Sequence, residues 1–150
     1  MPQSLTQLYV HIIFSTKNRY PFIQKGVEQE LYAYMGETIT RLGGIPFKIN
    51  GTNDHIHILT TLPRTVPISK LVEDIKRNSS RWIKGKGQIY QYFSWQRGYT
   101  ALSVSPSVKT VTMKYIANQK EHHRKRTYTA ELLEFLRRYN IQYDEQYLWD

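Results

Sequence analysis

Two histidines separated by one aliphatic residue, His55 and His57, are the residues of this sequence best suited to chemistry. Side chains alternate between the two faces of a β-strand, so both imidazoles would project from one face, about 7 Å apart at the backbone. Ile56 and Ile58 would share the opposite face and could pack against helices. Two imidazoles arranged in this way can share one divalent metal ion. Because the chain has no cysteine, a metal site in it would depend on such a pair.

The same triplet is also compatible with two ordinary polar residues on an open sheet face, since so short a pattern often arises by chance. A third ligand and a reactive group elsewhere would decide between the two interpretations. Tyr115 and Gln119 are four residues apart in an expected helix, so they lie on one helical face. The amide oxygen of Gln119 suits Mg²⁺ or Mn²⁺, and half of an octahedral shell would stay open for water and a phosphate oxygen.

Tyr115 would lie beside that open half, where its phenol could attack a phosphorus atom while the metal acts as a Lewis acid. A phenol has an ordinary pKa of about 10, so its oxygen needs activation by the metal, a neighbouring base or a bound water. A helical tyrosine is also a common packing residue, and Gln119 alone would suit a solvated surface. The adjacent His122 and His123 diverge by about 100° on a helix and are interpreted as basic-face residues near nucleic acid. Asp54 faces away from both imidazoles by strand alternation and is interpreted as a turn residue.

The composition favours a phosphate-rich partner. Twenty-one basic residues against twelve acidic ones give a net charge of +9, which suits nucleic acid above all, although a basic protein need not bind it. The absence of cysteine excludes disulfides, thiolate catalysis and cysteine zinc sites. The chain also lacks a Gly-rich phosphate loop and a spaced set of three carboxylates for a two-metal nuclease.

The 150 residues fit one compact domain, expected to span residues 1–150. No apolar run approaches the roughly 20 residues that span a bilayer, and no signal peptide is apparent, so we expect a cytoplasmic protein that does not enter a membrane. Hydrophobic periodicity predicts strands at residues 8–15, 46–50, 55–62 and 95–104, and helices at about residues 25–42, 67–84, 106–124 and 129–139.

This order of elements is β-α-β-β-α-β followed by further helices, the split βαβ pattern of ferredoxin-like and RRM-like proteins. It predicts an α+β fold with an antiparallel sheet of about four strands and two helices packed on one face. The strands at residues 8–15 and 55–62 are expected to be neighbours. The imidazoles would stand on the other face, and the tyrosine-bearing helix is the long element expected to cover them.

With His55 and His57 on a central strand and Tyr115 and Gln119 on a later helix, the chain resembles the single-tyrosine HUH transposases of the smallest bacterial insertion sequences. The REP-associated tyrosine transposases belong to the same superfamily. The resemblance runs nearly end to end and includes the segments 9–17, 95–105 and 143–149. It implies an enzyme that cuts and rejoins single-stranded DNA at element ends, forming a 5′-phosphotyrosine link and releasing a 3′-OH.

The resemblance also implies roles for particular residues. Tyr115 would be the nucleophile, and His55, His57 and Gln119 would hold Mg²⁺ or Mn²⁺. Partners would be single-stranded DNA with a hairpin and a second copy of the chain in a homodimer, with the tyrosine helix serving in cis or in trans. Candidate DNA contacts are the basic residues Lys17, Arg19, Lys76, Arg77, Arg81, Lys84, Lys86, Arg97, Lys120 and Arg124.

Three other functions remain open from the sequence. A domesticated or non-catalytic protein of the same fold could bind DNA hairpins without moving an element. An RRM-like binder would need stacking aromatics on the open face of the sheet, where this chain offers histidines. A relaxase or replication initiator shares the chemistry but typically carries more histidine ligands or a second tyrosine and further domains.

Overall fold

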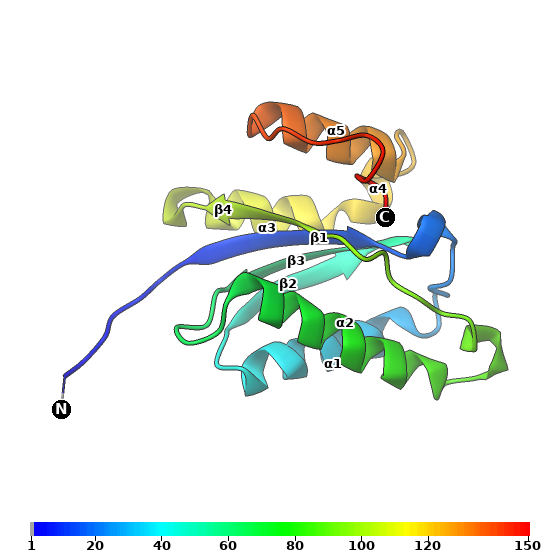
Figure 1. Ribbon diagram of the computed structural model, residues 1–150, viewed down its shortest axis with the longest axis horizontal. Coiled ribbons are helices and arrows are strands. Elements are labelled where there is room, and N and C mark those ends of the chain that lie inside the picture. The colour runs from blue at the N-terminus through cyan, green and yellow to red at the C-terminus, as the bar shows by residue number, and fades with distance from the viewer. Residues whose placement is uncertain (1) are drawn as a thin grey trace.

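The structure, a computed structural model, describes residues 2–150 and contains a four-stranded antiparallel sheet with helices on both faces (Figure 1). The strands are β1 (Tyr9–Ser15), β2 (Pro46–Gly51), β3 (His55–Thr61) and β4 (Thr100–Val104), in the order β2-β3-β1-β4. The helices are α1 (Glu28–Arg41), α2 (Ile68–Lys84), α3 (Lys109–Ala117), α4 (Gln119–His122) and α5 (Tyr128–Arg138). The predicted α+β fold is confirmed, including the pairing of β1 with β3.

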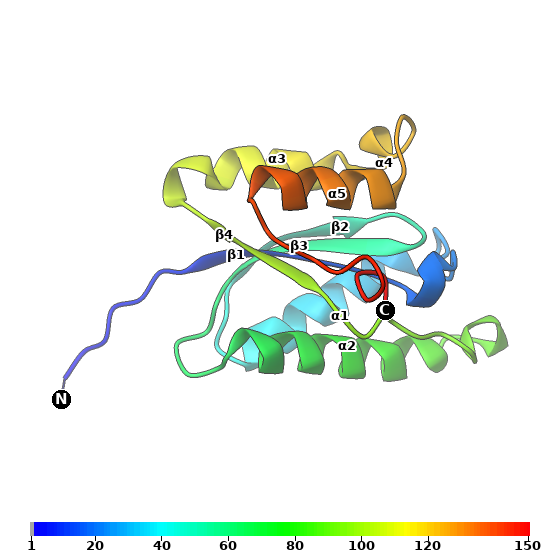
Figure 2. The same cartoon turned by 45° about the horizontal axis from the view of Figure 1, so that its top comes forward.

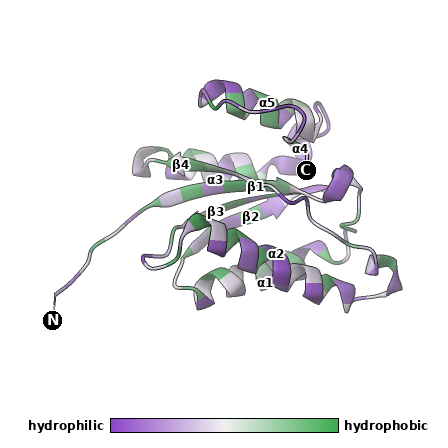
Figure 3. Cartoon of the chain, viewed as in Figure 1, coloured by the Kyte–Doolittle hydropathy of each residue, from purple (hydrophilic) through white to green (hydrophobic). Residues whose placement is uncertain are grey.

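Helices α1 and α2 cover one face of the sheet because the alternating residues of β1 and β3 present a continuous apolar surface to them. Ile12 and Phe14 of β1 and Ile56 and Ile58 of β3 are fully buried in this core. Both α2 and α5 carry hydrophilic and hydrophobic bands in Figure 3, as expected of helices with one buried side. This core fixes the register of β3 and therefore sends the other alternation, with both histidines, to the opposite face.

Two helical segments, α3–α4 and α5, cover the histidine-bearing face of the sheet side by side. Figure 2 shows α5 beside α3 and α4 on this side, opposite α1 and α2. Leu132 and Leu136 of α5 pack against Ile13 of β1 and Leu102 of β4. The expectation that the tyrosine-bearing helix alone covers this face was therefore wrong, because α5 has an apolar stripe of its own to bury.

The expected strand at residues 95–104 is shorter, since β4 begins at Thr100 and Trp95 makes only an isolated bridge with Thr16. The backbone groups before β4 have other partners. Lys76 on α2 donates to the carbonyls of residues 96, 97 and 98, and the amide of Gly98 donates to the Asp150 carbonyl at 2.8 Å. These hydrogen bonds take the place of the backbone hydrogen bonds between strands that the sequence pattern predicts here.

The helix expected over residues 106–124 is broken. A short 3₁₀ turn at Pro106–Val108 precedes α3, and Asn118, with φ −98° and ψ 21°, separates α3 from α4. The side-chain amide of Asn50 on β2 donates to the carbonyls of Ile116 and Ala117, at 2.9 and 3.1 Å. Because these carbonyls are bound by a side chain, the helical ladder can stop there.

Among residues 2–150, no helix is both long enough and apolar enough to cross a membrane. The cytoplasmic location and the single domain over residues 1–150 stay predictions.

Candidate active site

Strand β3 places His55 and His57 on the same face of the sheet, as the alternation predicts, and both side chains are completely buried. Their ring centroids are 5.2 Å apart. The tight turn before β3 depends on Gly51, because a Cβ at this position would lie 2.1 Å from the His55 carbonyl oxygen. The hairpin therefore fixes the point at which the histidine strand begins.

Each histidine is oriented through its Nδ1 atom. His55 Nδ1 lies 2.7 Å from a carboxylate oxygen of Asp54 and 2.9 Å from the hydroxyl of Thr52. Thr52 itself donates to Asp54, so the His55 ring donates its Nδ1 proton to this pair. Burial acts to raise the pKa of Asp54, but hydrogen bonds from His55 and Thr52 outweigh it and hold this pKa below its ordinary value. The interpretation of Asp54 as a turn residue that faces away from the imidazoles was wrong on the second point, because Asp54 ends the turn with its side chain against His55.

His57 Nδ1 lies 2.7 Å from His11 Nε2, across the β1–β3 pair. Burial lowers the pKa of His57 to about 4, and burial together with His57 lowers the pKa of His11 well below its ordinary value. Both rings are therefore neutral near pH 7, and one ring donates to the other. In both His55 and His57, the Nε2 atom is the one that faces the helices.

Tyr115 lies before the helix break at Asn118 and Gln119 lies after it, and both side chains approach the histidines. Gln119 is completely buried, and its Oε1 atom lies 3.0 Å from His55 Nε2. The Tyr115 hydroxyl donates to Glu131 and accepts from Arg126 at 3.4 Å. The structure thus brings the four predicted residues of the site together within one chain.

The adjacent His122 and His123 have different surroundings. Neither lies simply on a basic, solvent-facing side of the helix, as the sequence suggested. The ring of His122 stacks on Tyr115, with centroids 4.5 Å apart and an interplanar angle of 25°. His123 turns inward, so that its Nε2 atom lies 3.1 Å from Gln119 Oε1 and 3.2 Å from Glu131 Oε1. His123 is four residues after Gln119, so the two side chains lie on the same helical face.

Glu131 on α5 is the central residue that the sequence interpretation missed. It is completely buried and lies 2.9 Å from His57 Nε2. A signal for it exists, because Glu131 interrupts the otherwise apolar helical face made by Tyr128, Leu132, Phe135 and Leu136. A carboxylate on such a face needs a partner of its own.

This group of side chains suits a metal ion. One donor atom from each of His55, His57, His123 and Glu131 lies within 4.8 Å of the others. With Nδ1 of His55 against Asp54, its Nε2 atom faces the amide oxygen of Gln119 at 3.0 Å and Oε1 of Glu131 at 3.6 Å. Imidazole nitrogen, amide oxygen and carboxylate oxygen are all metal donors, so the residues present fit a metal ion.

Comparison with known proteins places the chain in a family. The family model described as "Transposase IS200 like" matches residues 4–119, which is most of the chain. The chain belongs to the IS200-like transposase family. A search of curated proteins gave no match.

Two solved structures share the fold of this transposase. One is a candidate transposase from Deinococcus radiodurans R1, with a TM-score of 0.61 and 23% identity over 79% of this chain and 98% of the other. The second is a REP-associated tyrosine transposase bound to a REP hairpin, with a TM-score of 0.61 and 14% identity over 82% of this chain and 72% of the other. The identities are low, so these two likenesses establish the fold.

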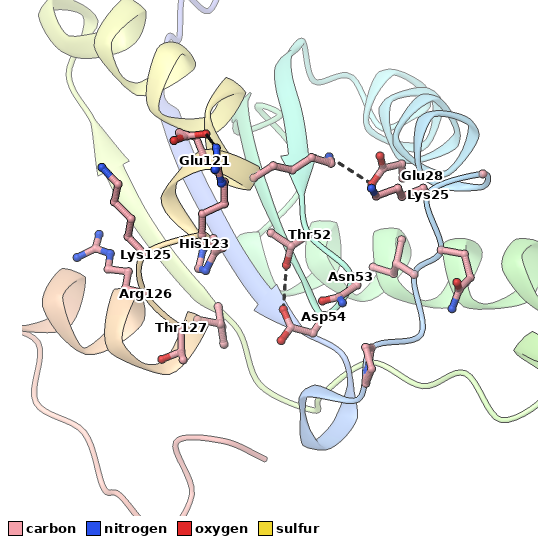
Figure 4. A pocket seen from close by; sticks show the side chains of 17 residues that line it. Lys25, Glu28, Thr52, Asn53, Asp54, Glu121, His123, Lys125, Arg126 and Thr127 are labelled. Carbon is pink, nitrogen blue, oxygen red and sulfur yellow. Dashed lines mark hydrogen bonds and ion pairs between the residues drawn. The ribbon is translucent and has the colours of Figure 1, made fainter.

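A groove of about 1250 Å³ with several basic residues opens next to the histidine and glutamate group of this transposase (Figure 4). Its lining includes Asp54 and His123, which both touch the site, and the basic residues Lys25, Lys120, Arg124, Lys125 and Arg126. In Figure 4 the side chains of His123 and Asp54 lie on facing walls of this groove. A strand lying in the groove would pass directly beside the buried histidines.

The predicted DNA contacts divide between the two sides of the sheet. Lys120 and Arg124 line the groove, whereas Arg77, Arg81 and Lys84 lie on α2 behind the sheet. Lys17 and Arg19 lie in the turn after β1, and Arg19 is 5.2 Å from the ring of Trp149. Arg97 lies beside Lys76, whose ammonium holds neighbouring carbonyls, and Lys86 pairs with Glu30 at 3.1 Å. The DNA-binding roles of all these residues stay predictions.

Proposed function

We propose that this transposase cuts and rejoins single-stranded DNA at the ends of an element, with Tyr115 as nucleophile and His55, His57 and Gln119 as metal ligands. The observation that supports it most is that the Tyr115 hydroxyl and the donor atoms of the histidine pair converge on one carboxylate, Glu131, within a single chain. A nucleophile and a metal site in contact are what phosphodiester transfer requires.

In the proposed reaction the Tyr115 oxygen forms a bond to phosphorus and the bond from phosphorus to the 3′ oxygen breaks. The products are a 5′-phosphotyrosine and a free 3′-OH, and the proton lost by the phenol balances the one gained by the 3′ oxygen. Because the phosphodiester energy is kept in the covalent link, attack by a 3′-OH can rejoin a strand without ATP. A bound Mg²⁺ or Mn²⁺ would supply Lewis-acid polarisation of the phosphoryl oxygen.

Three contacts hold the Tyr115 side chain for this attack. Its ring stacks on His122, and its hydroxyl lies between Arg126 and Glu131. Burial and the hydrogen bond to Glu131 raise the pKa of Tyr115, so the phenol is protonated at neutral pH in this state. The positive charge of Arg126 opposes this rise and favours the phenolate that attacks.

The substrate we propose is single-stranded DNA next to a hairpin. The basic groove beside His123 offers backbone contacts for a strand that leads to the Tyr115 hydroxyl. The solved REP-associated transposase was captured with a REP hairpin, which makes a hairpin the natural first ligand to test.

We also propose that the transposase works as a homodimer, as expected from the sequence resemblance. In this chain, Tyr115 faces the histidine pair of the same chain, with 5.9 Å between the ring centroids of Tyr115 and His57. On this basis we propose that the tyrosine helix serves in cis, and that the second copy holds the second DNA end for strand transfer. Sedimentation equilibrium with and without hairpin DNA tests whether the protein is a dimer.

The cleavage proposal is tested on a denaturing gel with Mn²⁺ and labelled single-stranded DNA that carries a hairpin. Wild type should give a covalent protein–DNA band, which Tyr115→Phe and His57→Ala should each lose. An adduct that survives in Tyr115→Phe would overturn the role of Tyr115. Binding of the hairpin with no adduct under any condition would instead support the non-catalytic hairpin-binding function.

A further inference from the structure

Glu131 is a buried carboxylate at the centre of the site, and it comes from a helix outside the family match. The family model ends at Gln119, whereas α5 spans Tyr128–Arg138. The oxygen Oε1 of Glu131 lies 2.9 Å from His57 Nε2, 3.2 Å from His123 Nε2 and 3.6 Å from His55 Nε2. The other oxygen, Oε2, accepts from the Tyr115 hydroxyl and from Gln119 Nε2, the latter at 3.3 Å. One side chain therefore touches every member of the proposed site.

Glu131 is a buried carboxylate whose hydrogen-bond partners are histidine, tyrosine and glutamine side chains. Within residues 2–150 its ion-pair partners are three histidines, with no lysine or arginine among them. A buried carboxylate is costly unless a positive charge accompanies it. Nδ1 of His55 is held by Asp54, so its Nε2 atom is the one that faces Glu131. A metal cation bound by Glu131 and the histidine Nε2 atoms would compensate the buried carboxylate.

We propose that Glu131 and His123 are additional protein ligands of the metal in this transposase. The inference rests on the proposed function and deepens its metal site. Together with His55, His57 and Gln119, they offer three imidazole nitrogens, a carboxylate oxygen and an amide oxygen. In an octahedral ion this set leaves one position, enough for one phosphate oxygen of the strand.

Two consequences follow from this set of donors. Mg²⁺ prefers oxygen ligands and keeps several waters, whereas imidazole suits transition metals, so a site with three imidazoles should favour Mn²⁺ over Mg²⁺. In addition, because the second oxygen of Glu131 holds the Tyr115 hydroxyl, the carboxylate ties the position of the nucleophile to the metal.

The experiment is calorimetric titration of metal-free, full-length protein with MnCl₂ and with MgCl₂. Wild type should bind Mn²⁺ more tightly than Mg²⁺. Glu131→Gln keeps the size of the side chain and should weaken Mn²⁺ binding by at least about tenfold. His123→Ala should reduce the ratio of the Mn²⁺ affinity to the Mg²⁺ affinity. Glu134→Gln is the matched control on α5, since Glu134 pairs with Arg137 and Arg138 away from the site, and it should bind Mn²⁺ as wild type does.

Circular dichroism checks that each variant is folded. If Glu131→Gln does not fold, Glu131→Asp keeps the charge and shortens the side chain, and it should also weaken Mn²⁺ binding. Unchanged or tighter Mn²⁺ binding by the folded Glu131 variant, with binding lost in His57→Ala, would overturn the inference: Glu131 would then compete with the ion. If wild type binds no Mn²⁺, or His57→Ala binds it normally, the metal site of the proposed function is itself wrong.

Discussion

The two histidines of β3 use both of their ring nitrogens, and this is what separates them from ordinary polar residues on a sheet. Nδ1 of His55 is held by Asp54 and Nδ1 of His57 by His11, so Nε2 of each ring points to the helices. Outer hydrogen bonds of this kind fix the tautomer and the direction of a metal-binding ring.

We therefore expect Asp54→Asn to weaken Mn²⁺ binding about 10- to 100-fold, because the neutral amide is a poorer acceptor for the His55 Nδ1 proton. Isothermal titration calorimetry measures the effect. Asp74→Asn is the matched control, since Asp74 lies on α2 behind the sheet and pairs with Lys70 and Arg77. Equal affinities of Asp54→Asn and wild type would show that Asp54 does not orient His55.

The sequence predicts the residues of the site that have a local pattern, but not those that depend on tertiary packing. The H-x-H triplet needs only strand alternation, and Tyr115 and Gln119 need only helical spacing. His123 is four residues after Gln119, so helical spacing could also have placed it on the inner face. The contacts of Glu131 with His57 and His123 depend on how α5 packs on the sheet, which no local pattern predicts.

Among the elements, the short helix α5 has the largest effect on the proposed site. Its apolar side packs on Ile13 and Leu102, and this packing holds Glu131 among the histidines. The strands and the helices α1 and α2 could be predicted from the sequence, because each has a long apolar stripe. The position of α5 could not, since an amphipathic helix near the end of the chain can cover any exposed apolar surface.

We expect Leu132→Ala to lower the free energy of unfolding by about 2–5 kcal/mol, because Leu132 is buried and the change leaves a cavity between α5 and the sheet. It should also reduce the rise in melting temperature produced by Mn²⁺, since the adjacent Glu131 loses its support. Urea unfolding and thermal melts with and without MnCl₂ measure these effects.

Leu133→Ala on the same helix is the control, because Leu133 is only partly buried, and it should cost about 1 kcal/mol or less. If Leu132→Ala is destabilised but keeps the full Mn²⁺ response, then α5 supports the fold without positioning the metal site.

Positive charge is present on both sides of the sheet, but only one side has the proposed catalytic residues. Lys25 and Lys125 line the groove beside His123, whereas Arg81 and Lys84 lie on α2. The net charge of +9 predicts a phosphate-rich partner but not its path, because basic side chains also serve on ordinary solvated helices.

Replacing Lys25 and Lys125 together by alanine should reduce the salt dependence of single-stranded DNA binding. Each lost phosphate contact lowers the slope of log K against log[salt] by about 0.7, so the double variant should lose about 1.4. Fluorescence anisotropy at several salt concentrations gives the slope. The pair Arg81→Ala and Lys84→Ala should leave it unchanged, and the opposite pattern would place the strand on the α2 side.

Detection of the covalent bond between DNA and protein shows directly whether Tyr115 carries the cut strand. The protein is incubated with Mn²⁺ and hairpin-bearing single-stranded DNA, digested with nuclease and trypsin, and analysed by tandem mass spectrometry. Cleavage after Lys114 and Lys120 gives a peptide that starts at Tyr115. We expect a nucleotide linked through its 5′ phosphate to Tyr115 in this peptide. A nucleotide on another tyrosine, or strand cleavage with no modified tyrosine, would contradict this expectation.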